Sequence, residues 1–390
     1  MKRLIIRNFG PIDNIEIELK RINLVIGPQS SGKSTLLKVA CYCTWVERQV
    51  VRTQDINQFC KVEVFLNNLI NFHRLEGYLK SDTYIVYVSD CASITYDAKL
   101  NICKFRWQDE KLKYQGTKIA YLPAERNLVS VISNWYQIKM EQNNLFAFMN
   151  DWEETRKSIK GLKQIMSLPF DYVYDSTNNK DKIVLHNGKH IDIVNASSGL
   201  QSIVPLVVTI DYLTNEFYEQ DNRSVESNYN YFKLLTKFLN IDGKSDNYIQ
   251  KILLTNRLFF PRYTSFFIEE PEAHLYPSTQ KDFIYTLIDK LNDDKQHFCF
   301  IATHSPYIMT SLNNLLLAGE KACESEVVKS KVLERFKEKQ LLNFDEVSAY
   351  AIDKGKVVDI LDSDYKMIVA ENLDGVSEEI ASDYDYLLNL

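Results

Sequence analysis

Short runs of apolar residues dominate the first 121 positions, and most of them have the length and composition of strands. Three runs precede the first helical pattern, which begins near residue 35. Four more runs, separated by polar turns, follow a second helical stretch at about 60–80. The expected strands are residues 2–8, 14–19, 21–26, 84–88, 92–96, 102–107 and 118–121. We expect the last four to form one antiparallel sheet.

The rest of the chain alternates helical and strand patterns. Residues 128–165 predict helices, and their apolar stripe is more typical of packed core than of a cofactor site. The stripe consists of Trp135, Ile138, Leu145, Phe148, Met149 and Trp152. A strand at 191–194 precedes an apolar helix that runs to about Leu213, and Ser198 is its predicted N-cap. Two further buried strands end near residues 269 and 303.

The bulk composition is that of one large globular domain with insertions, or of two ordinary domains. The chain has 390 residues, of which 45% are hydrophobic and 25% charged, with a net charge of −6. This charge argues against a surface that is coated by nucleic acid throughout. A local basic patch stays compatible with it, because binding depends on where the charges lie.

The seven cysteines and the N-terminus indicate a reduced, cytoplasmic protein. No two cysteines have the C-x-x-C spacing of a zinc or redox site, so we expect them to be small core residues. The first eight residues predict a strand and lack the apolar core of a signal peptide. No uninterrupted apolar run approaches eighteen residues, so we expect no membrane span.

Residues 27–35, with the sequence GPQSSGKST, fit the G-x-x-x-x-G-K-[ST] pattern of a phosphate-binding loop. A buried strand precedes the loop and an apolar-periodic helix follows it, which is the context that this loop requires. Backbone N–H groups and the helix N-terminus would then surround an anion. We expect Lys33 to be a surface point charge that reaches the β- and γ-phosphates, and the Ser34 hydroxyl to ligate Mg²⁺.

Two later strands end in side chains that suit a magnesium–nucleotide site. Glu269 and Glu270 close an apolar strand, and at its end the chain turns, so both carboxylates can approach one Mg·ATP. His304 closes the next strand. A lone histidine is more often structural, but ligands collect at the carboxyl ends of parallel strands.

Four stretches in this order resemble the ATP-binding cassette (ABC) superfamily, and within it the RecF/SMC/OLD-like group of AAA-labelled ATPases. They are residues 27–35 as Walker A, 196–201 as the signature, 268–277 as Walker B with its extension, and 302–306 as the switch histidine. The opening residues 5–12 also resemble this group. The segment 121–127 is similar to one in small bacterial ATPases found beside defence genes.

The resemblance implies an α/β fold: a single ABC-type ATPase head over residues 1–390. Its core sheet would be mixed or parallel, with an antiparallel β subdomain, helical insertions at 128–165 and 211–262, and a C-terminal α/β tail at 311–390. The chain departs from the transporter pattern because its signature keeps only one glycine, and because Glu269 stands where transporters carry Asp. Too few residues separate the motifs for SMC coiled-coil arms, and too few follow them for a TOPRIM nuclease.

The resemblance also implies ATP and Mg²⁺ as cofactors. The expected phosphate contacts are Gly27, Gln29, Ser30, Ser31, Gly32, Lys33, Ser34 and Thr35. Glu269 would hold Mg²⁺ together with Ser34, Glu270 would orient the attacking water, and His304 would sense the γ-phosphate. The Q-loop glutamine is not evident, with Gln115 and the region of Glu125 as candidates.

In this superfamily the signature of one copy closes on the nucleotide of another. Ser198 and Gly199 would therefore complete the site of a second copy, in a homodimer or larger homo-oligomer. The finer role implied is the regulatory ATPase of a bacterial antiphage or toxin–antitoxin-like system, acting with a separately encoded effector such as a nuclease.

A RecF-like DNA-repair ATPase is the alternative, and a transporter subunit is disfavoured by the signature. DNA binding would need a basic groove. The candidates for it are Arg156, Lys157, Lys160 and Lys163, which recur at helical spacing. Such a run is more often a solvated helix face.

Overall fold

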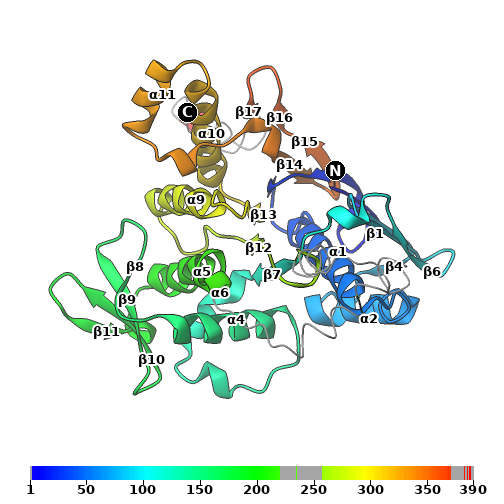
Figure 1. Cartoon of the computed structure of the whole chain (residues 1–390), viewed down its shortest axis with the longest axis horizontal. Coiled ribbons are helices and arrows are strands. Elements are labelled where there is room, and N and C mark those ends of the chain that lie inside the picture. Colours follow the sequence, from blue (N-terminus) through cyan, green and yellow to red (C-terminus); the bar gives the residue numbers. More distant parts are fainter. Residues whose placement is uncertain are drawn as a thin grey trace, which may run out of the picture.

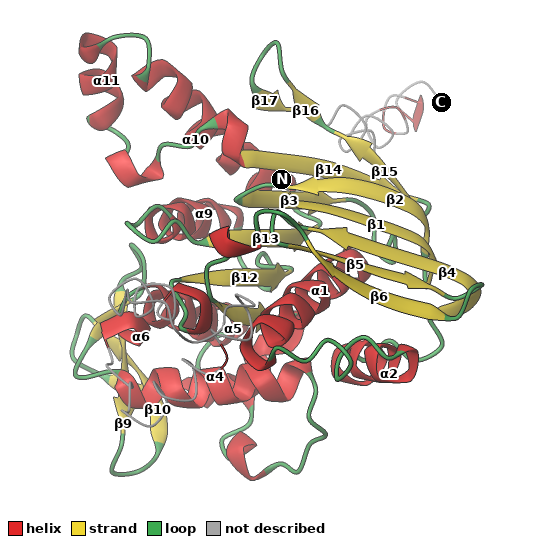
Figure 2. Cartoon of the chain, turned by 45° about the vertical axis from the view of Figure 1, so that its right-hand side comes forward, coloured by secondary structure: helices red, strands yellow, loops and turns green. Residues whose placement is uncertain are grey.

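One mixed sheet of eleven strands forms the centre of the chain in this computed structural model. The structure describes residues 2–219 and 257–369, together with positions 234, 382, 384, 386 and 387. The strands lie in the order β6-β5-β4-β1-β2-β15-β14-β3-β13-β12-β7, and Figure 2 shows their broad twisted surface. This α/β architecture confirms the expected fold class.

The N-terminal strands form the antiparallel half of the sheet, which includes three of the four strands predicted to form one antiparallel sheet. β1 (Lys2–Phe9) and β2 (Ile12–Leu19) pair as a hairpin, and β1 also pairs with β4 (Leu79–Val88). β5 (Ala92–Asp97) and β6 (Ile102–Trp107) continue the antiparallel series to the edge. These strands are continuous with the rest of the sheet and do not form a sheet of their own.

The prediction that residues 118–121 join this antiparallel series is wrong. β7 (Thr117–Leu122) lies at the opposite edge of the sheet and pairs in parallel with β12 (Tyr263–Glu269). The apolar run of a strand records its burial but not its partner, and this partner lies far along the chain.

The parallel half of the sheet brings distant segments together. β3 (Ile22–Ile26) lies between β14 (Val347–Asp353) and β13 (Phe298–Thr303), and β13 pairs in turn with β12. All of these pairs are parallel. The carboxyl ends of β3, β13 and β12 therefore lie next to one another. We call this end of the parallel strands the nucleotide edge, as distinct from the two edge strands β6 and β7.

Helices cover both faces of the parallel half. The core on one face contains Phe266 and Ile268 of β12 and the apolar sides of α5 (Ser198–Thr214), α9 (Pro277–Leu291) and α10 (Pro306–Ala322). The core on the other face contains Phe267, α1 (Lys33–Thr53) and α2 (Val62–His73). Side chains of a strand alternate between faces, so β12 is buried on both sides.

A lobe of α4 (Asn144–Ser158) and a second, four-stranded antiparallel sheet adjoins α5. Its strands are β8 (Lys163–Gln164), β9 (Phe170–Asp175), β10 (Lys180–Leu185) and β11 (His190–Asp192), in the order β11-β10-β9-β8. Figure 1 shows this sheet at the lower left, away from the large sheet. The apolar stripe predicted as core is largely buried here: Trp135, Leu145, Phe148, Met149 and Trp152 are buried, and Ile138 is exposed.

The remaining elements are short or lie near the C-terminus. They are α3 (Leu128–Val131), α6 (Glu216–Glu219), α11 (Glu326–Leu333), β15 (Lys356–Asp359), β16 (Leu361–Asp362), β17 (Met367–Ile368), and 3₁₀ turns at Lys111–Lys113, Ala124–Asn127, Trp135–Gln137, Ile193–Asn195, Glu338–Gln340 and Phe344–Glu346. Most of the helical insertion predicted at 211–262 lies outside the described residues.

The structure bears on the expectations for the cysteines and for a membrane span. Five cysteines are buried and Cys103 is half-buried, but Cys323 is exposed, so it is not a core residue. None of the helices in the described ranges combines the length and the apolar character needed to cross a membrane.

Candidate functional site

The phosphate loop leaves β3 and enters α1 with a backbone that requires glycine at two positions. Gly27 has φ 155°, and a Cβ there would lie 2.1 Å from the carbonyl oxygen of Ile352. Gly32 has φ 110° and caps α1 without a side chain. Pro28, Gln29 and Ser30 are exposed, so this part of the loop can meet a ligand.

Lys33 is buried, so the expectation of a surface point charge is wrong. Its Nζ donates to the carbonyl oxygens of Gly27 at 2.9 Å and of Pro28 at 2.5 Å, and only 4% of the residue is exposed. Burial lowers the pKa of Lys33 to about 8, while the charges of Glu270 and Glu272 act in the opposite direction. The ammonium group thus binds two carbonyls on the inner side of the loop, and it lies near the acidic end of β12.

The structure brings Glu269, Glu270 and His304 to the same edge. Glu269 is the last residue of β12, and Glu270 follows it with φ 42° and donates its N–H to the carbonyl oxygen of Ala302. His304 follows β13, and its Nε2 lies 3.3 Å from Oε1 of Glu270. The His304 backbone N–H donates to the Glu272 carboxylate at 2.6 Å. An acid and a histidine in contact beside Lys33 suit the activation of water at a phosphate.

Glu269 fits the expected cation site. Only 4% of the residue is exposed, and its Oε1 has no hydrogen-bond partner among the described residues. Burial raises the pKa of this carboxyl, and Lys38 Nζ, 3.9 Å from Oε1, acts in the opposite direction. Ser34 lies half-buried in the first turn of α1. A buried carboxylate with an unused oxygen and a hydroxyl group form a donor set that Mg²⁺ accepts together with phosphate oxygens and water.

Arg126 binds the backbone of the acidic turn after β12. The sequence analysis did not identify this residue. It is fully buried, and its guanidinium donates to the backbone carbonyls of Glu269 and Glu270, each at 2.9 Å. It also donates to the carbonyls of Pro123 and Pro271 at 3.2 Å. Burial lowers its pKa to about 10, so the group stays protonated. The only sequence signal was the segment 121–127, and nothing in it singled out the arginine.

Of the two Q-loop candidates, only the segment of Glu125 lies at this edge. Gln115 precedes β7, whereas Glu125 follows it, and the strands β7 and β12 run in the same direction. Glu125 forms an ion pair with Arg74 at 2.8 Å.

The signature segment lies on the other face of the sheet from α1. Ser197, not Ser198, is the N-cap of α5, and no side-chain hydrogen bond accompanies it. Ser198 is exposed as the first helical residue. A Cβ on Gly199 would lie 3.1 Å from the carbonyl oxygen of His274, in the turn that follows the acidic strand.

The basic run considered for a DNA groove is divided: Lys157 and Lys160 are exposed, whereas Arg156 is buried, and α4 ends at Ser158 before the last two lysines. Arg156 is 1% exposed and pairs with Glu153 and, at 3.2 Å, with Asp181. Lys163 forms ion pairs with Asp211 and Glu216. Helical spacing does not show which residues are buried. Here Arg156 and Lys163 are paired with carboxylates of the chain, and the run does not form one basic surface.

One protein family matches the part of the chain that contains the acidic strand β12. Residues 261–309, which contain β12, α9 and β13, match the AAA ATPase domain family. No curated protein matches the chain.

Solved structures of ATPase heads align along the whole chain at low identity. The SMC head domain from Thermotoga maritima is 9% identical, with a TM-score of 0.39 over 92% of this chain and 97% of that one. The Smc head of Pyrococcus furiosus, solved with the C-terminal domain of ScpA, is 10% identical, with a TM-score of 0.38 over 98% and 100%. A bacterial ABC transporter cassette solved as a dimer, MJ0796, is 12% identical, with a TM-score of 0.29 over 91% and 96%.

At these scores none of the similarities assigns a substrate or partner to this chain. The fold is assigned from the strand order of this chain and from the motifs at its strand ends. The family match adds to this only over β12 and β13. We conclude that the chain has an α/β fold in which a phosphate-loop motif and an acidic strand end lie at adjacent strand ends, and that residues 261–309, which contain this acidic strand, are similar to the AAA ATPase domain family.

Proposed function

We propose that the chain binds and hydrolyses Mg·ATP at the edge formed by β3, β13 and β12. The observation that carries this proposal is the convergence of Lys33, Glu270 and His304 at adjacent strand ends, with Glu270 and His304 3.3 Å apart. Lys33 binds the phosphates. Glu270 accepts a proton from the attacking water, and His304 orients that carboxylate.

Magnesium would be held by Ser34 and Glu269. When bound, the ion neutralises charge on the phosphate oxygens. Arg126 is a positioning residue here, because it fixes the backbone carbonyls on either side of the Glu270 turn.

ATP would join two copies head to tail. Support comes from the placement of α5 and α1 on opposite faces of the sheet, so that the exposed Ser198 is free to meet a second copy. Loss of the γ-phosphate would then release the pair, which makes the ATPase a switch.

The test is phosphate release by Lys33→Ala, by Ser198→Arg and by their equimolar mixture. Each variant alone should be inactive: Lys33→Ala because it no longer binds ATP, and Ser198→Arg because charge and bulk obstruct the interface while ATP binding persists. The mixture should recover turnover, since one composite site in a mixed dimer is intact. A wild-type rate per subunit that does not change with protein concentration would overturn the dimer.

The finer role follows the resemblance of residues 121–127. We propose a regulatory ATPase of a bacterial antiphage or toxin–antitoxin-like system, which acts through a separately encoded effector. Stable co-purification with the product of a neighbouring gene would support this role. Salt-dependent binding of DNA by the isolated chain would instead support the repair alternative.

A further inference from the structure

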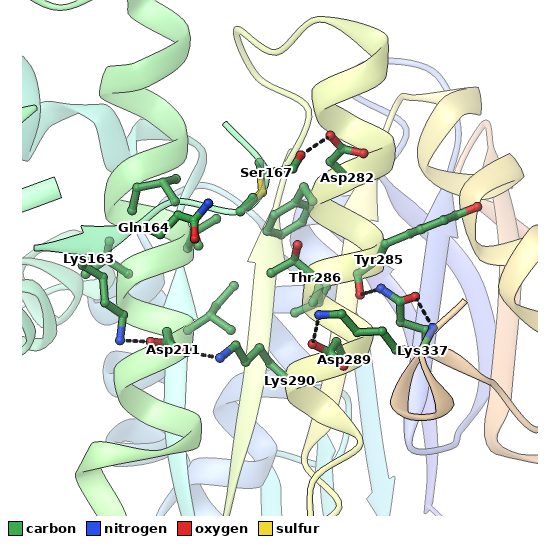
Figure 3. A pocket seen from close by; sticks show the side chains of 18 residues that line it. Lys163, Gln164, Ser167, Asp211, Asp282, Tyr285, Thr286, Asp289, Lys290 and Lys337 are labelled. Atoms are coloured by element: carbon green, nitrogen blue, oxygen red, sulfur yellow. Dashed lines mark hydrogen bonds and ion pairs between the residues drawn. The ribbon is translucent and has the colours of Figure 1, made fainter. Parts of the chain in front are cut away.

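Among the cavities lined by described residues, two that lie outside the nucleotide edge differ in how their polar groups are used. The cavity in Figure 3 has a volume of about 590 Å³ and lies between α5, α9 and the end of β8. Its charged groups bind one another: Asp211 pairs with Lys163 and Lys290, and Lys337 with Asp289. These pairs leave the lining satisfied without a ligand.

The second cavity has a volume of about 480 Å³ and is enclosed by α1, α2, β7 and the start of α4. These four elements are labelled in Figure 1. Its wall combines aromatic rings with side-chain amides. The aromatic members are Tyr42, Trp45, Phe72, His73 and Tyr121, and the amides are Asn67, Asn68, Asn71 and Gln142. A mainly apolar wall with a few convergent polar groups is the usual construction of a small-molecule site.

His73 and Tyr121 are the members of this wall that have a buried polar atom without a hydrogen-bond partner among the described residues. His73 is 1% exposed, and its Nδ1 is the atom without a partner. Aromatic rings surround the imidazole, with centroids 4.9 Å away for Phe72 and 5.4 Å for Tyr121. Burial lowers the pKa of His73 to about 3, so the ring is neutral. A buried ring nitrogen without a partner is costly unless a ligand or water satisfies it.

The cavity favours a neutral, planar ligand. Lys118 and Asp151 both line it, but they form an ion pair at 2.6 Å, and the third charged residue of the lining, Arg48, also has an interaction within the chain. Tyr42 and Trp45 lie stacked, with centroids 5.8 Å apart, and they offer a flat apolar wall. The three asparagines of α2 present donors and acceptors on one side. Flat rings and amides together recognise the face and the edge of a heteroaromatic ring.

We propose that this cavity binds a neutral heteroaromatic ligand of nucleoside size, with its ring against Trp45 and Phe72 and an edge donor bound to His73. The site is distinct from the phosphate loop and does not depend on the proposed ATPase activity. Tyr121 connects the two places. Its ring forms part of the cavity wall, and burial, together with the charge of the nearby Glu269, raises the pKa of its hydroxyl.

The experiment measures binding of adenosine, guanosine, cytidine and uridine to the full chain by calorimetry, supported by thermal shift. At least one nucleoside should bind in a saturable manner. His73→Phe keeps an aromatic ring in a place already lined by rings, and it should weaken that binding about three- to tenfold, the scale of one hydrogen bond. The exposed His190→Phe is the matched control and should bind as the wild type does.

Lys33→Ala separates this site from the phosphate loop. Nucleosides lack phosphates, so the variant should bind them normally even though it loses ATP. Binding that disappears in Lys33→Ala and persists in His73→Phe would overturn the proposal, and so would the absence of saturable binding by all four nucleosides. If His73→Phe does not fold, Asn71→Ala on the exposed side of α2 takes its place, with the same expected loss.

Discussion

Buried charged groups are left partly unpaired at the nucleotide edge of the large sheet. In the lobe formed by α4 with β8–β11, the buried arginine is fully paired. At the edge, Glu269 keeps a buried oxygen that accepts no hydrogen bond from the described residues, and Glu270 has a positive φ. In the lobe, the buried Arg156 is bound on every side: by Glu153, by Asp181, by Asn179 at 2.9 Å, and by the face of Trp135 at 4.9 Å. Unused capacity suits a ligand, whereas complete pairing suits a scaffold.

This contrast predicts which changes damage stability and which damage turnover. Substitutions in the lobe should unfold the protein and leave the chemistry of the folded fraction intact. Substitutions at the edge should do the reverse.

The largest expected effect on stability is that of Arg156→Met. The substitution leaves Asp181, which is 7% exposed, as a buried carboxylate without its cation, although Tyr172 still donates to it. Removal of one partner from a buried pair costs about 3–5 kcal/mol. Urea denaturation measures the loss.

The neighbouring Lys157→Met is its matched control. Lys157 also pairs with Glu153, but its side chain is 59% exposed, so its loss should cost no more than about 1 kcal/mol. If the two variants lose the same free energy of unfolding, the buried ion pair of Arg156 with Asp181 does not stabilise the fold. Wild-type ATP affinity in folded Arg156→Met would keep the lobe apart from the site.

The next effect is a loss of turnover in Glu270→Gln. The amide keeps the shape of the side chain but cannot accept the proton of the attacking water, so phosphate release should fall about a hundredfold or more. ATP binding and the thermal midpoint should stay near wild type, because the side chain is 40% exposed.

Glu269→Gln distinguishes the two carboxylates. This variant should bind Mg²⁺ more weakly, because the buried oxygen proposed as a ligand loses its charge. Phosphate release should therefore need a higher Mg²⁺ concentration than in the wild type. If Glu269→Gln binds Mg·ATP normally and alone abolishes turnover, the roles assigned to these residues are reversed.

The edge was largely predictable because its motifs are contiguous. The loop at 27–35 needs a particular local backbone, and the apolar runs before Glu269 and His304 mark buried strands whatever their neighbours. Arg126 was missed because its acceptors, Glu269 and Glu270, lie more than a hundred residues away. No local pattern records such a contact.

The lobe was poorly predictable for the same reason. The short strands β8 to β10 carry mixed apolar and polar residues, and only pairing makes them a sheet. Arg156 shares a helical side with other cations, and its burial depends on Asp181 of β10. Such features arise from tertiary packing, which sequence spacing does not contain.

The smallest expected effect is a pH dependence of ATP affinity that arises from Lys33. Burial holds the pKa of Lys33 at about 8 in the free protein, well below the usual value of a lysine. Bound phosphates favour the charged form and raise that pKa. ATP affinity should therefore fall as the pH rises above about 8, by roughly tenfold at pH 9. Calorimetric titration at pH 7.5, 8.0, 8.5 and 9.0 measures it.

The sign for stability is opposite, so unfolding does not explain this loss of affinity. Between about pH 8 and the ordinary lysine pKa, the unfolded chain binds more protons at Lys33 than the folded chain does. This group therefore makes the free energy of unfolding rise with pH in that window. Lys33→Arg provides a control, because a guanidinium stays charged, and any ATP binding it retains should not change from pH 8 to 9. Constant wild-type affinity up to pH 9 would mean that Lys33 remains protonated in the free loop, and that its contacts with the carbonyls of Gly27 and Pro28 outweigh the cost of burial.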